Sequence, residues 1–489
     1  MIEKAAIKEP HKKLTITFIV TKDCNFRCKY CYMVHKRNDG RMSFEVAKAA
    51  VDYFLGEREH IRQDNVIWEF IGGEPLLEVD LIEKIIDYTR IRAWQLDHPW
   101  FEHAMYSFST NGTLYDNPKF QRMLRQYPGH LDVGLTLDGP AHVHDRERVF
   151  PDGSGTHAHV IRNLERWMKN TPLPSTKVTI SHDTLSTLAE SILYLFSVGM
   201  VQVNANVVFE DVWEEGDDDL LEEQLDLLGN TMIEQDLWRE HSCSFFSRVL
   251  GDPLPPPPLM EQNWCGAGKY MIAVDSEGKF YPCVRFVDHS LVKQKPIIIG
   301  DIKNGIDLDK LRPFYELTRS GQSTQECIEC EVASGCAWCQ GFNYDDSGSI
   351  NHRATYICKM HKARARANKR FWDKIDAITG GSPMETKTSC EVNPNETPCG
   401  KVSAEERDEI KALFERKMGL AEVFQALAKM EPEPRDAMYE KAVADMGETS
   451  RKFHSWWEQT ARKHNWEGVE GGSWRIDFDS CEVFLVRPQ

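Results

Sequence analysis

Residues 21–33 read TKDCNFRCKYCYM, in which Cys24, Cys28 and Cys31 lie within eight positions. The preceding segment, LTITFIVT at 14–21, alternates polar and apolar side chains and is rich in β-branched residues, which predicts a strand. Three thiolates on one loop can hold three irons of a cubane cluster and leave the fourth iron open for another group. A structural zinc site usually takes four ligands, so a zinc loop with a distant ligand, or a set of buried core cysteines, is the alternative interpretation.

Strand-like and helix-like segments alternate along the first part of the chain. The expected strands are 14–21, 65–73, 105–112, 131–139, 177–183 and 201–211, and the expected helices include 43–57, 76–96, 156–169 and 186–199. This alternation predicts a parallel sheet with right-handed crossovers. Polar and glycine residues recur where the strands end, as GGEP, STNG, LDG and NAN. In α/β folds, ligands bind at that edge of the sheet.

The rest of the chain changes character several times. Residues 212–240 are acidic and helical in pattern, which favours a solvated helix face, and GDPLPPPPLM at 251–260 is too rich in proline for regular structure. The basic stretch 361–375 predicts a helix. We therefore expect an α/β core at 1–215, an acidic and proline-rich connector at 216–264, a cysteine-rich domain at 265–375, a linker at 376–401, and a small, mostly helical accessory domain at 402–489 that ends in a strand.

The composition narrows the class of protein. The chain has 489 residues and a net charge of −17 without a basic stripe, which argues against a nucleic-acid groove. No stretch is long and apolar enough for a membrane span, and the N-terminus lacks the apolar segment of a secretory signal, so we expect a cytoplasmic protein. Inside cells, clustered cysteines indicate metal ligands or catalytic groups rather than disulfides, and this chain has 14 cysteines.

Four motifs together resemble the radical S-adenosylmethionine (SAM) enzymes. They are CNFRCKYC, GGEP at 72–75, STNG at 109–112 and LDGPAHVHDRER at 137–148, the last as in the peptide-acting branch of that family. The resemblance implies an α/β fold with a partial (βα)6, TIM-like barrel, and a [4Fe-4S] cluster on the three-cysteine loop whose open iron binds SAM. One electron from such a cluster splits SAM and yields a 5′-deoxyadenosyl radical, while the protein supplies binding and orientation.

The same resemblance implies which residues contact SAM. They are Tyr30, Gly72, Gly73, Glu74, Ser109, Asn111, Arg148, Asn204 and Asn206. The two glycines permit close approach of another backbone. For the polar residues of this set, the alternative is that they only cap turns and strand ends. No residue is assigned a catalytic role, because the cluster itself is the source of the radical.

The later cysteines resemble the SPASM extension of radical SAM peptide maturases, which holds two auxiliary [4Fe-4S] clusters. Their pattern is Cys265-x12-Gly278-x4-Cys283, then Cys327-x2-Cys330-x5-Cys336-x2-Cys339 and Cys358, with x2 where x3 is usual before Cys339. The resemblance implies that Cys327, Cys330, Cys336 and Cys358 hold an outer cluster, and that Cys265, Cys283 and Cys339 hold an inner one. Paired C-x2-C units are also typical of zinc ribbons, which is the alternative.

The inner set is one cysteine short of four. No cysteine lies between Cys265 and Cys283, so we hypothesise three cysteine ligands and an open iron. Such an iron could bind the thiolate of a substrate cysteine and serve as the place where a carbon–sulfur bond forms. Cys243 is a candidate fourth ligand, and an unrelated free thiol is the alternative for it.

The segment PIIIGDI at 296–302 and the residues around Cys336 and Cys339 resemble the CXXX-repeat target maturases, which make the thioether-crosslinked peptides called ranthipeptides. The implied partners are a ribosomal precursor peptide and a flavodoxin- or ferredoxin-type electron donor. A sulfatase-maturase-like oxidation is disfavoured, because Val284 stands where those enzymes have an aspartate base. The sequence is also compatible with epimerase or cyclophane chemistry, and with a zinc-binding scaffold that has no enzymatic activity.

The C-terminal region is a candidate for peptide recognition, because too few residues precede the first strand for a leader-binding winged helix. Trp456, Trp457 and Trp466 lie on a helical stretch, and EVFLV at 482–486 could offer a strand edge to a peptide. The alternative is ordinary packing of these tryptophans in a small helical core.

Overall fold

The computed structural model describes residues 13–34, 40–210, 212–248, 250, 265–333, 336, 339–380, 396–469 and 471–487. The proline-rich stretch that we expected to be irregular, 251–260, lies outside these residues. The chain divides into two compact units, which we call the sheet unit (Met1–Lys84 with Met105–Met384) and the hairpin unit (Ile85–Ala104 with Glu385–Gln489).

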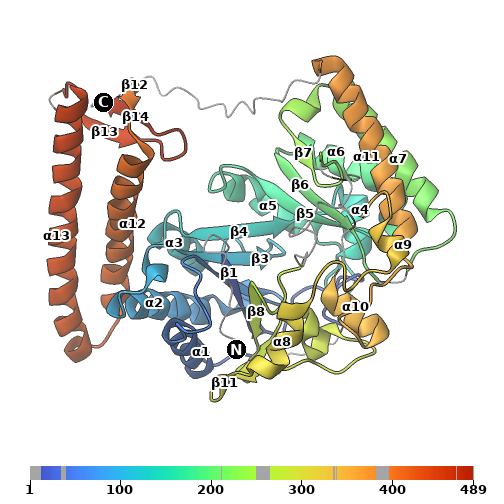
Figure 1. Ribbon diagram of the computed structural model, residues 1–489, viewed down its shortest axis with the longest axis horizontal. Coiled ribbons are helices and arrows are strands. Elements are labelled where there is room, and N and C mark those ends of the chain that lie inside the picture. The colour runs from blue at the N-terminus through green and yellow to red at the C-terminus, as the bar shows by residue number, and fades with distance from the viewer. Residues whose placement is uncertain are drawn as a thin grey trace. The chain divides into compact units, whose positions relative to one another are not determined.

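The sheet unit is built on six neighbouring strands whose spatial order equals their order along the chain (Figure 1). They are β1 (Leu14–Thr21), β2 (Val66–Gly72), β3 (Ala104–Thr110), β4 (Leu131–Thr136), β5 (Ser175–Ile180) and β6 (Gln202–Val207). The connecting helices are α1 (Phe44–Gly56), α2 (Val79–Gln95), α3 (Pro118–Gln126), α4 (Ala141–Glu147), α5 (His157–Met168) and α6 (Leu188–Ser197). The pairs β1–β2, β3–β4, β4–β5 and β5–β6 are parallel. The predicted α/β partial barrel is confirmed.

Large apolar side chains from successive strands form the core of the sheet unit. Phe18 of β1 and Trp68 of β2 are both 0% exposed, and their rings stack with centroids 5.7 Å apart. Phe54 of α1 meets Trp68 edge-on at 6.5 Å, so the helix covers this face of the sheet. Burying each such side chain contributes roughly 1.5–3 kcal/mol. Helix α6 ends as expected, because Gly199 adopts a φ of +99° that other residues rarely tolerate.

Short strands extend this sheet at both edges and were not predicted from the sequence. Strand β7 (Ser242–Cys243) pairs with β6, and β8 (Met271–Val274) pairs with β1, both in parallel. Beyond β8 follow β9 (Lys279–Tyr281), β10 (Gly300–Asp301) and β11 (Gly305–Ile306), each antiparallel to its neighbour. The cysteine-rich region thus continues the sheet from its β1 edge and adds α8 (Leu308–Glu316), α9 (Gln325–Ile328) and α10 (Gln340–Ser347).

The acidic helix α7 (Asp217–Glu234) lies beside the basic helix α11 (Cys358–Thr379), as Figure 1 shows. Arg370 donates to Glu222 at 2.6 Å and to Asp226 at 2.7 Å, and Arg366 donates to Glu222 at 2.7 Å. The expectation that the acidic stretch presents only a solvated face was therefore wrong for this side of α7. Charges 144 residues apart in the chain meet there, which a local charge pattern does not reveal.

The hairpin unit contains two long helices, α12 (Ala404–Leu427) and α13 (Pro432–His464), and a three-stranded antiparallel sheet. The strands are β12 (Glu396–Lys401), β13 (Ser473–Ile476) and β14 (Glu482–Val486), in the order β12-β14-β13 (Figure 1). Residues 396–401, which lie within the expected linker, form a strand, and the expected terminal strand is a hairpin.

Two of the candidate recognition tryptophans belong to the core of the hairpin unit. Trp456 and Trp457 are 9% and 8% exposed and pack with Ile410 and Val483. The alternative of ordinary core packing is therefore confirmed for both. Among the described helices, none combines the length and the apolar character needed to cross a bilayer.

Candidate functional site

The three-cysteine loop follows β1 and is held mainly by backbone hydrogen bonds. The N–H of Arg27 donates to the carbonyl of Val149 at 2.7 Å, and the N–H of Lys29 donates to the carbonyl of Glu147 at 2.9 Å. Arg27 also donates from Nη1 to the carbonyl of Cys24 at 2.6 Å. Cys24 is 7% exposed, whereas Cys28 and Cys31 are half-buried. The loop therefore presents its sulfurs from a backbone that is fixed at several points.

The glycine pair of the GGEP motif makes room for this loop. The N–H of Gly73 donates to the carbonyl of Thr21 at 3.0 Å, and Gly72 has a φ of +152°. A Cβ atom at Gly73 would lie 2.0 Å from the carbonyl oxygen of Asp23 and 2.7 Å from Cβ of Cys24. Both glycines are thus needed for the backbone to approach the cysteine loop, while their expected contact with SAM stays a prediction.

Replacing Gly73 by alanine should displace the cysteine loop, because its Cβ would overlap the backbone of Asp23. Moving packed backbone costs about 1–3 kcal/mol or more, so we expect reduced iron content and loss of SAM binding. Gly56→Ala is the matched control, since nothing lies within 4 Å of a Cβ there. Iron and sulfide analysis with equilibrium SAM binding measures both, and wild-type values for Gly73→Ala would contradict the steric argument.

Glu74 joins the ends of β2 and β3. Its carboxylate accepts hydrogen bonds from Oγ1 of Thr110 at 2.7 Å, from the N–H of Asn111 at 2.8 Å and from the N–H of Leu76 at 3.0 Å. Burial raises the pKa of Glu74, and these donors partly offset that rise. Asn111 in turn donates from Nδ2 to Oδ1 of Asn25 in the cysteine loop at 2.7 Å. These hydrogen bonds connect the ends of β2 and β3 to the cysteine loop. Direct contacts of Glu74 and Asn111 with SAM stay predictions.

The remaining candidates lie on β3 and β6. Ser109 of β3 is half-buried and pairs in register with Gly134 of β4. On β6, Asn204 is half-buried and Asn206 is exposed, on the face opposite the buried Val203 and Ala205. The side chain of Asn206 donates to the carbonyl of Val207 at 3.0 Å. Ser109 and Asn206 are the second-last residues of their strands, at the edge where ligands bind in such folds, whereas Asn204 lies in the middle of β6. Contacts of all three residues with SAM stay predictions.

Asp138, which sequence reasoning did not select, connects two of the predicted site residues. Tyr30 donates its hydroxyl to Oδ2 of Asp138, and Arg148 donates from Nε to the same oxygen at 2.6 Å. The Arg148 guanidinium lies 5.3 Å from the centre of the Tyr30 ring and 4.0 Å from Sγ of Cys28. Burial raises the pKa of Tyr30 well above its ordinary value, so the phenol stays a donor. Among the described residues, Oδ1 of Asp138 is buried without a hydrogen-bond partner.

The His-Asp pair of the LDGPAHVHDRER motif positions Asp138 and Arg148. The N–H of Asp138 donates to Nδ1 of His144 at 3.3 Å, and Nε2 of His144 lies 3.0 Å from Oγ1 of Thr156. Burial lowers the pKa of His144 to about 4, so the ring is neutral at neutral pH. Asp145 accepts a hydrogen bond from the N–H of Thr156 at 2.7 Å and so fixes Thr156 beside His144. The position of Asp138 after a strand, in an LDG turn, is the sequence signal that could have identified it.

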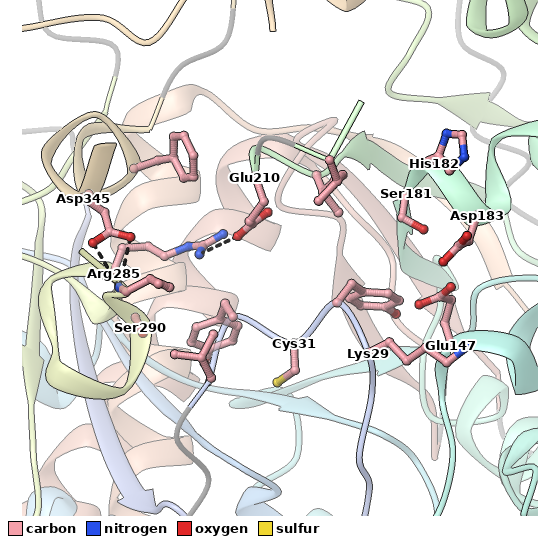
Figure 2. A pocket seen from close by; sticks show the side chains of 18 residues that line it. Lys29, Cys31, Glu147, Ser181, His182, Asp183, Glu210, Arg285, Ser290 and Asp345 are labelled. Carbon is pink, nitrogen blue, oxygen red and sulfur yellow. Dashed lines mark hydrogen bonds and ion pairs between the residues drawn. The ribbon is translucent and has the colours of Figure 1, made fainter. Parts of the chain in front are cut away.

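A cavity of about 340 Å³ opens beside the cysteine loop (Figure 2). One wall of the cavity belongs to the cysteine loop and consists of Lys29, Tyr30, Cys31 and Tyr32. A second wall follows β5 and β6 and consists of Ser181, His182, Asp183 and Glu210. The third wall belongs to the cysteine-rich region and consists of Arg285, Gly341, Phe342 and Asp345. Such a cavity suits a substrate segment that must reach both the loop and the cysteine-rich region.

Several charged groups face this cavity. Arg285 donates from Nη1 to Oε1 of Glu210 at 3.3 Å and lies 5.4 Å from the centre of the Tyr32 ring. His182 contacts Asp217 through Nδ1 at 2.9 Å, and this hydrogen bond raises the pKa of His182. Glu147 is 2% exposed, and its Oε1 has no hydrogen-bond partner among the described residues. Burial raises the pKa of Glu147, so this carboxyl group is available to exchange a proton or to accept a hydrogen bond.

The structure brings the later cysteines together in the two predicted sets. The outer cysteine group, Cys327, Cys330, Cys336 and Cys358, lines one small cavity. The inner cysteine group is Cys265, Cys283 and Cys339. Burial first, and then the nearby Cys265 and Cys339, raise the pKa of the Cys283 thiol well above its ordinary value. Their role as cluster ligands stays a prediction.

Cys243 lies apart from both groups. It belongs to β7 and is 3% exposed. Burial raises its pKa to about 12, and a backbone hydrogen bond from Phe245 and the charge of Arg364 partly offset that rise. Within the described part of the chain, no three or more His, Cys, Asp or Glu side chains are grouped to hold a single metal ion. Thiolates around a cubane cluster are held by separate irons and do not need that close spacing.

Residues 18–193 match the model of the radical SAM superfamily. This part of the chain therefore resembles a radical SAM domain. This domain contains the three-cysteine loop, the glycine pair and the Tyr30–Asp138–Arg148 contacts. The chain is 25% identical over 365 residues to the cysteine-type anaerobic sulfatase-maturating enzyme of Clostridium perfringens, covering 69% of this chain and 91% of that relative.

Two other relatives are a maturase and a synthase by name, and a third is uncharacterized. Mycofactocin maturase MftC of Mycolicibacterium smegmatis is 26% identical over 334 residues, covering 66% of this chain and 76% of the relative. Radical SAM cyclopropyl synthase TigE of Paramaledivibacter caminithermalis is 22% identical over 376 residues, covering 72% and 73%. An uncharacterized protein of Methanocaldococcus jannaschii is 30% identical over 190 residues, 39% of this chain, and only 60% of that relative's length is spanned.

Two solved structures share the fold. Native anSMEcpe with bound AdoMet and a peptide has a TM-score of 0.57 and 20% identity, covering 75% of this chain and 99% of that chain. SuiB of Streptococcus suis bound to precursor peptide SuiA has a TM-score of 0.50 and 13% identity, covering 73% and 78%. The likeness extends beyond the radical SAM domain into the cysteine-rich region, which resembles the SPASM region of these proteins.

Proposed function

We propose that this protein is a radical SAM peptide maturase that installs thioether crosslinks, each joining a cysteine sulfur to a carbon, in a ribosomal precursor peptide with Cys-x-x-x repeats. The observation that carries the proposal is the cavity that is lined by the three-cysteine loop and by residues next to the inner cysteine group. Cys31 of the three-cysteine loop lines it, and Arg285 and Gly341, each two positions from a cysteine of the inner group, line its opposite side. A substrate in this cavity lies beside both the three-cysteine loop and the inner cysteine group.

The residues around the three-cysteine loop fit a [4Fe-4S] cluster and SAM. Cys24, Cys28 and Cys31 supply three soft thiolates, and Oδ1 of Asp138 is a buried acceptor without a partner among the described residues. When bound, this pair of groups supplies a 5′-deoxyadenosyl radical for hydrogen abstraction. Tyr30 and Arg148 hold Asp138 in place for that ligand, and the glycine pair of GGEP leaves space beside the loop.

The inner cysteine group supports carbon–sulfur chemistry because it supplies three described thiols rather than four. A cluster held there would keep one iron for the thiolate of the peptide, and the outer group would hold a fully cysteine-ligated cluster. We infer that Cys243 does not complete the inner set, since it belongs to β7 at one end of the sheet order, whereas Cys283 follows β9 near the other end. The cofactors we propose are therefore SAM and three [4Fe-4S] clusters.

Each thioether removes two hydrogens from the peptide. One leaves the acceptor carbon as a hydrogen atom, taken up as 5′-deoxyadenosine forms. The other leaves the sulfur as a proton, and one electron passes to the protein. Glu147 suits the proton-accepting role, because this buried residue lines the cavity, its Oε1 has no partner among the described residues, and burial raises its pKa. A flavodoxin- or ferredoxin-type carrier is the proposed external electron partner.

The relatives support a peptide substrate but name several chemistries, so the product decides the proposal. Val284 follows Cys283, and no carboxylate is available at that position for sulfatase-maturase-like oxidation. Reconstituted protein should be incubated with a Cys-x-x-x precursor peptide, SAM and a reductant, then read by tandem mass spectrometry. We expect loss of two hydrogens per crosslink, with the linked cysteine protected from alkylation.

Three different outcomes would contradict the proposal. Loss of two hydrogens with every cysteine still alkylated would indicate carbon–carbon chemistry, such as a cyclophane or cyclopropyl product. An unchanged peptide mass in ordinary water, with one deuterium incorporated when the reaction is run in deuterated water, would indicate an epimerase. A colourless preparation that contains zinc and no iron or sulfide would indicate a zinc-binding scaffold instead.

A further inference from the structure

Two buried arginines border the outer cysteine group. Arg353 is 7% exposed and Arg319 is 8% exposed. Arg353 donates from Nη2 to Sγ of Cys336 at 2.9 Å and from Nη1 to Oγ of Ser323 at 3.1 Å. The guanidinium is thus fixed by a second contact while one of its N–H groups points at a sulfur. A charged guanidinium that is fixed in this way forms a stronger hydrogen bond to a thiolate than a neutral donor does.

Ser323 connects the two arginines, because its Oγ accepts from Nη1 of Arg353 at 3.1 Å and donates to the carbonyl of Arg319 at 2.7 Å. Burial, followed by the charge of Arg353, lowers the pKa of Arg319, while Cys336 acts in the opposite direction. Two like charges in a buried place are unfavourable unless an anionic group lies between or beside them. A thiolate-ligated cluster is such a group, and it becomes more anionic on reduction.

The inner cysteine group has a different electrostatic environment. Arg285 is a half-buried cation two positions after Cys283. However, Arg285 also donates to the carboxylate of Glu210 at 3.3 Å, so part of its charge is balanced by that group. The outer group therefore faces two buried cations and a direct N–H···S bond, whereas the inner group shares one cation with a carboxylate.

We propose that Arg353, supported by Arg319, holds the cluster of the outer cysteine group at a higher reduction potential than the cluster of the inner group. The outer group is then the one that accepts the electron from the inner group. Positive charge and hydrogen bonds to cluster sulfurs favour the reduced, more negative state. This inference rests on the proposed function, because it takes both groups to hold [4Fe-4S] clusters.

The electron balance follows from the chemistry of the crosslink. Closing one carbon–sulfur bond leaves one electron on the protein and releases one proton. The electron passes from the inner group to the outer group, and from there to an oxidised flavodoxin- or ferredoxin-type carrier. Arg353 and Arg319 make the first of these transfers downhill and keep the inner group free for the next peptide sulfur.

The test is an electron paramagnetic resonance redox titration of the full chain, reconstituted anaerobically, with Cys283→Ala and Cys327→Ala variants to assign the signals. We expect the outer group to have the higher potential in the unchanged protein. Arg353→Gln should shift that potential to a lower value, Arg353→Lys should shift it less, and the inner group should not move. Lys359→Gln is the matched control, because Lys359 is exposed beside Cys358 and its charge is screened by solvent.

Arg319→Gln provides a second variant that leaves the Arg353–Cys336 bond in place, should Arg353→Gln fail to assemble its cluster. It should lower the outer potential in the same direction. Full iron content with an unshifted outer potential in both glutamine variants would overturn the inference alone, as would an outer potential below the inner one in the unchanged protein. Iron missing from the outer group of the unchanged protein would overturn both the inference and the proposed cofactor content.

Discussion

Replacing Cys28 by alanine should abolish SAM cleavage, with 5′-deoxyadenosine falling below detection. The loop has no fourth cysteine to replace the lost thiolate, because residues 21–33 contain Cys24, Cys28 and Cys31 and no other cysteine. If three clusters are present, about one third of the iron should also be lost. Quantitative chromatography of 5′-deoxyadenosine, together with iron and sulfide analysis, measures both effects.

Cys243→Ala is the matched control for this experiment. Cys243 is a buried thiol on β7 and was a candidate fourth ligand of the inner group. We expect unchanged iron content and unchanged 5′-deoxyadenosine formation, with at most a modest loss of stability from the removed sulfur. Retained cleavage in Cys28→Ala would refute the loop as the SAM-binding cluster site, and iron loss in Cys243→Ala would return Cys243 to the ligand set.

Replacing Glu422 by glutamine should strongly destabilise the hairpin unit. Arg90 bonds to Glu422 through Nε and Nη2, and it donates from Nη1 to the carbonyl of Phe101 at 2.5 Å. The two side chains are 0% and 1% exposed, so the substitution leaves an uncompensated buried charge. Such a loss costs about 3–5 kcal/mol in free energy of unfolding.

Hydrogen exchange read by mass spectrometry measures this effect locally, which suits a chain of more than one unit. Amides of α12 should lose protection in Glu422→Gln. Lys429→Met is the control, because Lys429 and Asp87 form a more exposed pair, 2.8 Å apart, within the same unit. Exposed pairs contribute about 0–1 kcal/mol, so its protection should change little. Equal protection in both variants would show that the buried pair does not stabilise the unit.

Local patterns were sufficient for the six main strands and for the three-cysteine loop. Apolar, β-branched segments that end in turn residues predict β1 to β6. Strand β3 buries alternate side chains, whereas β1 is buried along almost its whole length. The same reasoning could not find β8 to β11, which are two to four residues long and show no period of their own. Their pairing depends on β1, more than 250 residues earlier in the chain.

The candidate site shows the same division. The spacing of Cys24, Cys28 and Cys31 is a local property, and so is the need for glycine in GGEP. Asp138 was missed because it matters only through Tyr30, 108 residues away, and Arg148. Glu74 was expected to contact SAM, and only the structure shows that Thr110, Asn111 and Leu76 occupy its carboxylate as donors.

The sequence by itself therefore determined the α/β fold class and the three-cysteine loop, because spacing and periodicity are properties of neighbouring residues. The division of the later cysteines into two sets was implied by the resemblance to the SPASM extension and not by their spacing. Only the tertiary structure decided that Asp138 holds Tyr30 and Arg148 beside Cys28, that Glu147 lines the cavity, and that Arg353 reaches Cys336. Burial and hydrogen bonding between distant segments set these features, since a buried polar atom is stabilised by whichever partner the fold brings to it.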